Sequence, residues 1–156
     1  MKTNFVNESD LIDFKIISPI HPSATSKIGW LEKEKLLILL HNLLYSYGLI
    51  DNNYKAFSKH FWGTSSGSIN YIKWYGEITQ LVYLFDLLIT LNCIPNHRNK
   101  RHKILIEHFF NRLGNKFDSR SMRTTLNQLR NNSEGSVMIN EIFDKLFISD
   151  KNFTNH

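Results

Sequence analysis

The stretch "IKWYGEITQLVYLFDLLI" (Ile72–Ile89) nearly repeats "IGWLEKEKLLILLHNLLY" (Ile28–Tyr45), which lies 44 residues earlier. At this offset seven residues between positions 28 and 50 have identical counterparts: Ile28/Ile72, Trp30/Trp74, Leu37/Leu81, Leu40/Leu84, Leu43/Leu87, Leu44/Leu88 and Ile50/Ile94. After a four-residue shift, His60-Phe61 also matches His108-Phe109. We expect a repeated unit made of an extended lead, a long helix, a turn and a second helix that ends in His-Phe. Neither unit can bury its apolar stripe alone, so the two should stack.

Hydrophobic periodicity predicts a mainly α fold with two related helix-turn-helix units and one short strand. Apolar residues spaced as on one face of a helix, together with the positions of Gly, Pro and capping residues, set the element boundaries. The expected helices are Glu32–Tyr47, Asn53–Phe61, Glu77–Leu91, Lys100–Leu113, a helix from Asp118 or Ser119 to about Asn131, and Val137–Phe147. The expected strand is Ile69–Trp74, which is rich in Ile, Tyr and Trp.

The same pattern divides the chain into four segments. Residues 1–27 form an N-terminal arm, and residues 28–67 form the first helical unit. Residues 68–150 form a second helical unit, which is basic and winged-helix-like, and residues 151–156 form a frayed tail.

Composition excludes several classes of protein. The chain has 156 residues and is 42% hydrophobic, enough to bury a core. No apolar run reaches the roughly 18 residues of a membrane-spanning helix. The N-terminal residues carry several acids before any apolar stretch, which does not match a secretory signal. Cys93 is the only cysteine, so no internal disulfide can form, and we expect a cytoplasmic protein.

Positive charge is concentrated in one part of the chain. Residues 95–130 hold nine Lys and Arg against Glu107 and Asp118, a net charge of +7, whereas the whole chain has +5. This asymmetry favours an anionic partner, nucleic acid first. A solvated basic surface remains the alternative.

The expected helix at about 119–131 separates apolar from cationic residues. At 100° per residue, Met122, Leu126 and Leu129 share one sector. The opposite side carries Arg120, Arg123, Thr124, Asn127, Arg130 and Asn131. Arginine can donate two hydrogen bonds to guanine, and asparagine can pair with adenine, so this face suits the major groove of double-stranded DNA.

The preceding helix and its turn supply cations that could contact phosphates. These are Lys100, Arg101, Lys103 and Lys116, with Arg98 beside them. A four-residue turn, "GNKF", would join the two helices as in a helix-turn-helix pair, and the Ile69–Trp74 strand would make it winged-helix-like. Two alternatives stay open: the face is only solvated, or a non-enzymatic helical adaptor docks an acidic protein through residues 95–130.

The chain offers no motif for metal, cofactor or catalysis. Its seven histidines lack zinc-binding spacing, and no phosphate loop or nucleophile elbow is present. We interpret His60 and His108 as half-buried equivalents in the two units, and Cys93, Trp30 and Trp74 as packing residues. We therefore expect no cofactor and no enzymatic activity.

Three stretches resemble the RteC-like family, regulatory proteins of bacterial mobile elements. They are "YIKWYGEITQLVYLFDLLI", "IEHFFNRLGNKF" and "DSRSMRTTLNQLR", and the resemblance covers roughly Leu43 to Leu146. Ile72, Trp74 and Gly76 match the lead of the family's C-terminal half, and Arg123 and Arg130 match arginines of its late helix. The chain is shorter at the N-terminus and has "NNSEGS" where a basic cluster would follow that helix. The resemblance implies a helical, winged-helix-like DNA-binding transcriptional regulator.

Overall fold

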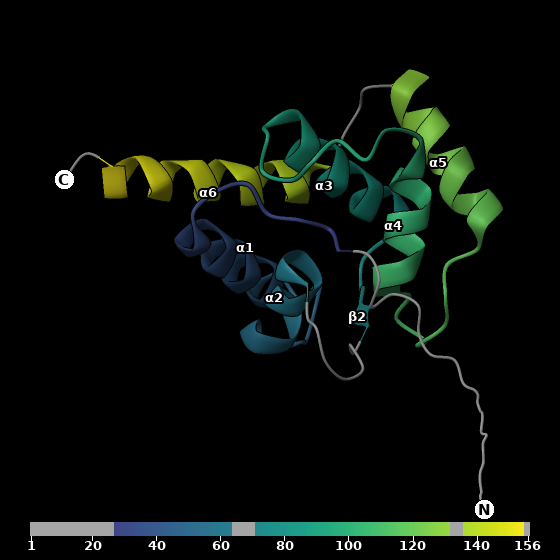
Figure 1. Ribbon diagram of the computed structural model, residues 1–156, viewed down its shortest axis with the longest axis horizontal. Coiled ribbons are helices and arrows are strands. Elements are labelled where there is room, and N and C mark those ends of the chain that lie inside the picture. Colours follow the sequence, from purple (N-terminus) through teal and green to yellow (C-terminus); the bar gives the residue numbers. More distant parts are fainter. Residues whose placement is uncertain (1–26, 64–70, 132–135, 155–156) are drawn as a thin grey trace, which may run out of the picture.

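The computed structural model describes residues 27–63, 71–131 and 136–154 and is mainly helical, as the sequence predicts (Figure 1). The N-terminal arm expected at residues 1–27 lies outside the described residues except for Lys27. In chain order the elements are α1 (Glu34–Ser46), α2 (Tyr54–Trp62), β2 (Ile72–Lys73), α3 (Ile78–Thr90), the 3₁₀ turn η2 (Arg98–Lys100), α4 (Arg101–His108), β3 (Phe109–Phe110), α5 (Ser119–Asn131) and α6 (Val137–Thr154).

The long helices of the two units, α1 and α3, begin and end at equivalent positions. Both contain 13 residues, and both their first and last residues are 44 positions apart. Before each helix a tryptophan Nε1–H donates to a backbone carbonyl three residues on: Trp30 to Lys33 at 2.9 Å and Trp74 to Glu77 at 2.8 Å. After each helix one residue takes a left-handed conformation, Gly48 with φ 75° and Asn92 with φ 60°.

Two reciprocal hydrogen bonds join the units. The Leu31 N–H donates to the Cys93 carbonyl at 2.8 Å, and the Tyr75 N–H donates to the Leu49 carbonyl at 2.9 Å. Leu31 and Tyr75 are 44 positions apart, and so are Leu49 and Cys93. The lead of each unit therefore bonds to the turn after the long helix of the other unit. This is the exchange of equivalent contacts that two-fold related copies make.

A short parallel sheet replaces the end of an expected helix. Strand β2 pairs with β3 through Ile72↔Phe109 and Lys73↔Phe110, and the Trp74 N–H donates to the Phe110 carbonyl at 2.8 Å. The helix predicted at Lys100–Leu113 consequently stops at His108. Apolar residues at helical spacing continue to Phe109, but pairing with a segment distant in sequence overrides the local pattern.

The connection between α4 and α5 differs from the predicted four-residue turn. It spans residues 109–118 and contains β3 and a turn in which the Asn111 N–H donates to the Asn115 carbonyl at 2.8 Å. The chain needs these ten residues because Phe109 and Phe110 first pair with β2. The predicted strand is present only as Ile72–Lys73 among the described residues, and it pairs ahead of α5.

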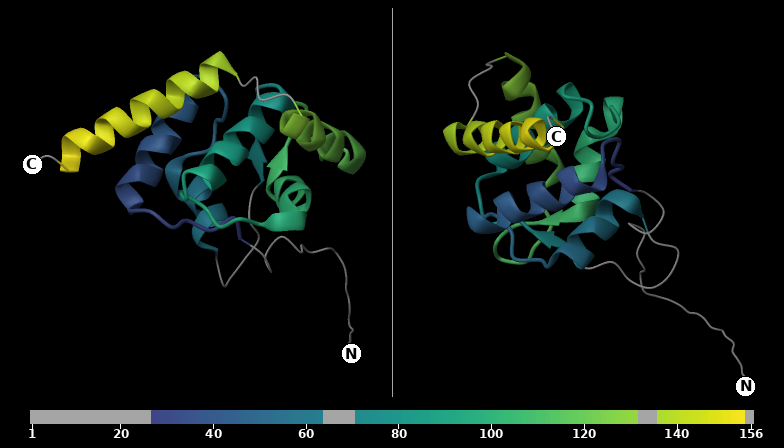
Figure 2. Two further views of the ribbon diagram at one scale, coloured as in Figure 1. Left: turned by 90° about the horizontal axis from the view of Figure 1, so that it is seen from above. Right: turned by 90° about the vertical axis from the view of Figure 1, so that its left-hand side faces the viewer.

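The last helix is longer than the sequence predicts. Helix α6 continues past Phe147 to Thr154, and it lies across α1 and α3, with its C-terminal end projecting beyond α1 (Figure 2). Ile139, Ile142 and Leu146, each 0% exposed, face the core. The helix therefore covers the apolar surface that the two units share.

The core contains residues from both units, among them the equivalent histidines His60 and His108. Trp30 and Trp74 are buried, as expected, and so is Cys93. His60 and His108 were expected to be half-buried, but their exposed fractions are 1% and 0%. They are more deeply buried because the two units place them against each other.

Candidate nucleic-acid interface

Helix α5 presents Arg120 and Arg123 to solvent because its apolar face is anchored. Met122 is 0% exposed and Leu126 is 7% exposed, and the helix packs on α3 and α4. Thr125, which the sequence did not place, is also buried, and its hydroxyl donates to the Ser121 carbonyl at 2.8 Å. These contacts fix the rotation of α5 about its axis, so that its polar face points outward.

The N-terminus of α5 is fixed by Asp118. Its carboxylate accepts a hydrogen bond from the Ser121 N–H at 2.9 Å, so of the two capping residues that the sequence offers, Asp118 and Ser119, Asp118 caps the helix. Bonds from Ser121 hold the pKa of Asp118 below its usual range, and Arg120 lowers it further. The capped end thus sets where the exposed face begins.

Three of the predicted groove-facing residues share this exposed face. Arg120, Arg123 and Asn127 are exposed and lie within about 60° around the helix. Arg130 lies in the last turn of α5, and its side chain is outside the described residues. Within the described part of the chain, Arg123 forms no ion pair, whereas Arg120 lies near Asp118.

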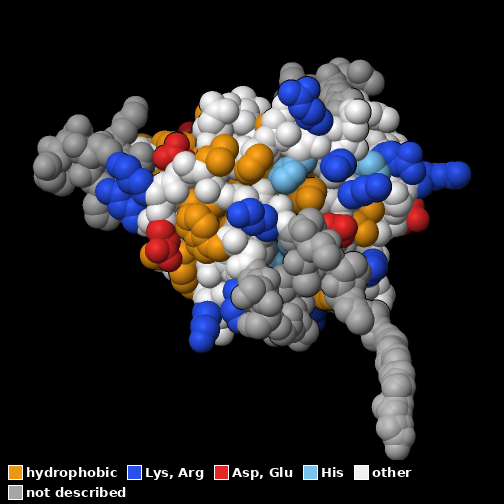
Figure 3. Space-filling view, viewed as in Figure 1, with side chains coloured by type: hydrophobic (Ala, Val, Ile, Leu, Met, Phe, Trp, Pro, Cys, Tyr) orange, Lys and Arg blue, Asp and Glu red, His pale blue; other side chains and the backbone are white. Residues whose placement is uncertain are grey.

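The predicted phosphate-contacting cations are spread over three elements. Lys100 in η2, Lys103 in α4 and Lys116 in the connection before α5 are all exposed. Figure 3 shows Lys and Arg side chains gathered over the part of this face where α4 and α5 lie. The basic segment of the sequence is therefore a basic surface.

Arg101 does not behave as a free phosphate ligand. Its Nη1 lies 3.2 Å from Asp86 Oδ1, and its Nη2 donates to Asn96 Oδ1 at 3.3 Å. The Arg101 side chain is only 17% exposed. Helix α3 thus brings to Arg101 a carboxylate that linear spacing did not indicate.

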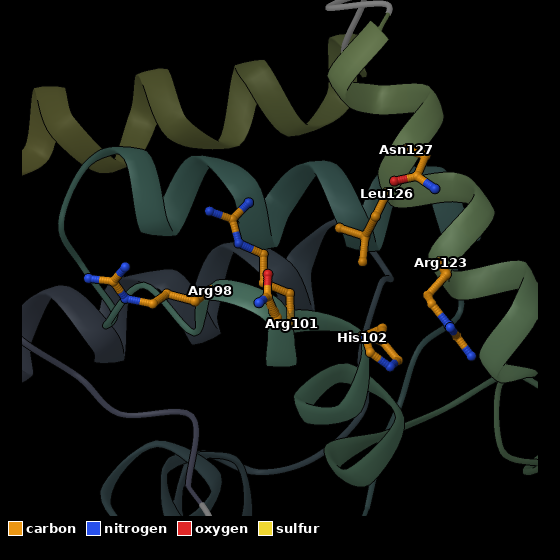
Figure 4. A pocket seen from close by; sticks show the side chains of 7 residues that line it. Arg98, Arg101, His102, Arg123, Leu126 and Asn127 are labelled. Atoms are coloured by element: carbon orange, nitrogen blue, oxygen red, sulfur yellow. The ribbon is translucent and has the colours of Figure 1, made fainter.

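A hollow lies between η2, the first turn of α4 and the middle of α5 (Figure 4). Its volume is about 270 Å³. The lining residues are Arg98, Asn99, Arg101, His102, Arg123, Leu126 and Asn127. It brings Arg101, Arg123 and Asn127 of the predicted set together, while Arg120, Lys100, Lys103 and Lys116 lie outside its lining.

Sequence reasoning missed His102 and Asn99 as members of this site. Burial lowers the pKa of His102, and the positive charges of Arg123 and Lys103 lower it further. A sequence feature could have identified the region: the offset between the units rises from 44 to 48 between Ile94 and His108, which is an insertion of four residues. That insertion falls where η2 forms.

Among the described residues, no helix combines the length and the apolar character that crossing a bilayer requires. Comparison with known proteins finds no family model, no curated sequence and no solved structure that matches the chain.

Proposed function

We propose that this protein is a double-stranded DNA-binding protein and a transcriptional regulator, with α5 in the major groove. The supporting observation is that buried Met122 and Leu126 hold α5 so that Arg120, Arg123 and Asn127 form one exposed row. Guanidinium and amide groups at this spacing match the hydrogen-bonding edges of guanine and adenine. The resemblance of residues 118–130 to the late helix of RteC-like proteins supports the same role.

In this proposal α4 and α5 act as the helix pair of a helix-turn-helix protein, joined by ten residues in place of four. Lys100, Lys103 and Lys116 contact phosphates on either side of the groove. The chain works without enzymatic activity or a cofactor. Arg101 helps to line the hollow beside α5, and Asp86 already balances its charge.

Binding to a fluorescent duplex, followed by anisotropy over a series of salt concentrations, tests the proposal. Affinity should fall steeply as salt rises, because each neutralised phosphate releases counterions. Replacing Arg123 with Ala should weaken binding and reduce the slope of log affinity against log salt by about 1. Lys59→Ala removes one positive charge from an exposed position on α2 and should leave both quantities nearly unchanged. Equal affinities for the Arg123→Ala variant and the wild type would show that α5 is not the DNA-contacting helix.

A second candidate function is docking of an acidic protein by a helical adaptor. The observation that favours it is Leu113, which is 79% exposed between Arg112 and Lys116. Protein interfaces combine an apolar core with arginine, which is enriched there. A partner captured from nuclease-treated lysate, and lost in a Leu113→Ser variant, would support the adaptor; loss of all captured material on nuclease treatment supports DNA.

A further inference from the structure

The hollow between η2, α4 and α5 is large enough to hold one small chemical group. Its volume of about 270 Å³ falls just short of the roughly 300–1,000 Å³ of ligand pockets. It is nevertheless many times larger than the space of about 30 Å³ that one water occupies in the liquid. A phosphate group with its attached oxygens fits between these limits, whereas a bulky cofactor does not.

The charge of the lining favours an anion. Three arginines and His102 line the hollow, and none of the described Asp or Glu residues does. Asp86 neutralises only Arg101, so Arg98 and Arg123 remain without an ion pair among the described residues. Burial, and then the positive charges of Arg123 and Lys103, lower the pKa of His102. An anion placed in the hollow would oppose the part of this shift that the positive charges cause.

The polar groups approach from two sides. Figure 4 shows Arg123 extending from α5 next to His102 of α4, with the Asn127 amide one turn along α5. The guanidinium groups of Arg98 and Arg101 lie at the other end of the hollow and point away from Arg123. Leu126, 7% exposed, supplies an apolar surface between the two ends. The Arg123 end therefore holds the groups best placed to donate hydrogen bonds to one anion.

The hollow forms where the second unit differs from the first. The first unit reaches α2 directly from its turn, with Asn53 capping the helix through a bond from the Ala56 N–H at 2.8 Å. The second unit inserts four residues before α4, and Arg98 takes a left-handed φ of 48°, which is unfavourable for a residue other than glycine. The insertion contributes Arg98 and Asn99 to the lining. The units are thus alike in the core and differ where the cationic hollow forms.

We infer that this hollow binds one phosphate group of the nucleic-acid backbone, with Arg123 and His102 as its ligands. The inference rests on the proposed function for its choice of partner. When α5 enters the groove, the adjacent backbone phosphate sits against the first turn of α4, where the partial positive charge of the helix end adds to the attraction. In this arrangement Arg123 contacts the backbone in place of a base edge, and Arg120 and Asn127 remain beside the bases.

The test follows the backbone and imidazole resonances of the full chain by NMR during three titrations: inorganic phosphate, adenosine monophosphate and a short DNA duplex. Sodium chloride at matched ionic strength is the baseline. We expect the resonances of Asn99, His102 and Asn127 to shift in all three titrations. The shifts should occur at millimolar concentrations of phosphate or mononucleotide and at micromolar concentrations of duplex. Arg123→Gln should weaken the phosphate affinity about tenfold, as loss of a charge-assisted hydrogen bond does. Arg112→Gln, an exposed arginine outside the hollow, is the matched control and should change it less than twofold.

The three titrations separate the possible failures. Shifts no larger than those caused by sodium chloride in all three would overturn the site. Duplex binding by anisotropy without shifts at His102 and Asn127 would also overturn it, while leaving the proposed DNA-binding function intact. Shifts with phosphate or the mononucleotide, but no duplex binding, would keep the phosphate-binding hollow with a free phosphate compound as its ligand and reject DNA as the partner.

Discussion

The Nδ1 atoms of His60 and His108 lie 2.8 Å apart in the core, at equivalent positions of the two units. A hydrogen bond between two Nδ1 atoms needs one protonated and one bare nitrogen, so the pair holds one proton between the rings. The rings are nearly perpendicular, with an interplanar angle of 77°. His108 Nε2 is buried and has no partner among the described residues. The contact between the units therefore depends on neutral imidazole.

This contact predicts that acid destabilises the fold. Burial, and then the charges of His60 and His97, lower the pKa of His108 to about 3 from its ordinary value of 6.5. At a pH between about 3 and 6.5, His108 binds a proton in the unfolded chain but not in the folded chain. The contribution of His108 to the free energy of unfolding is therefore fully present above pH 6.5 and is lost as the pH falls. Urea unfolding should give a free energy about 2 kcal/mol lower at pH 5 than at pH 7.5 from this group alone. His108→Gln should flatten this part of the pH dependence; an unchanged pH profile in that variant would contradict the assignment.

Two left-handed glycines should respond differently to alanine. Gly29 has φ 91°, and a Cβ there would lie 2.7 Å from Pro95 Cδ, whereas Gly48 has φ 75° and open space around it. Gly48→Ala should cost about 1 kcal/mol for the backbone conformation alone. Gly29→Ala should cost about 2–4 kcal/mol, because overpacking adds to the same backbone term. Denaturant unfolding of both variants measures the difference, and equal losses would contradict the contact between the first lead and Pro95.

Adjacent residues of α5 should separate stability from binding. Met122→Ala removes a fully buried side chain and should cost about 2–5 kcal/mol of unfolding free energy. Arg123→Ala changes an exposed position and should stay within about 0.5 kcal/mol of the wild type while weakening DNA binding. Unfolding and anisotropy measurements on both variants test this, and a destabilised Arg123→Ala variant would mean that α5 is rotated from the orientation described.

The Asp86–Arg101 ion pair should limit the affinity for nucleic acid. Asp86→Asn removes the carboxylate 3.2 Å from Arg101 and should free its charge for phosphate. We expect tighter non-specific duplex binding, with a salt dependence steeper by up to about 1 in log-log slope. Stability should fall by about 1 kcal/mol, because the pair is partly exposed to solvent. Asp144→Asn makes the same charge change at an exposed position of α6 and is the control; equal gains in both variants would show a general charge effect.

The imidazole of His102 should report the charge of Arg123. Burial is the main reason that its pKa is lowered, and Arg123 is the next contributor. Arg123→Gln should therefore raise the pKa of His102 in an NMR titration, since one positive charge that opposes protonation is gone. Arg112→Gln should leave that pKa unchanged, and a similar rise in both variants would indicate that Arg123 does not face His102.

The sequence by itself determined the helices and their inward faces. Apolar spacing in Leu36, Leu40 and Leu44, and in Met122 and Leu126, encodes a buried stripe within a few turns of one helix. The capping positions of Asn53 and Asp118 are equally local, because a side chain and the N–H three residues on lie in the same segment. The repeat and the concentration of positive charge at residues 95–130 were also visible in the linear order.

Only the tertiary structure decided which of these residues meet. It paired Ile72 with Phe109 and thereby ended α4 at His108, and it set His60 against His108. It placed Arg101 in an ion pair with Asp86, and it placed Arg123 in the lining of a hollow. The physical reason is that helical periodicity depends on neighbours within four residues, whereas these contacts depend on how two stacked units are oriented. That orientation is fixed by packing the whole core, which no single stretch of the sequence contains.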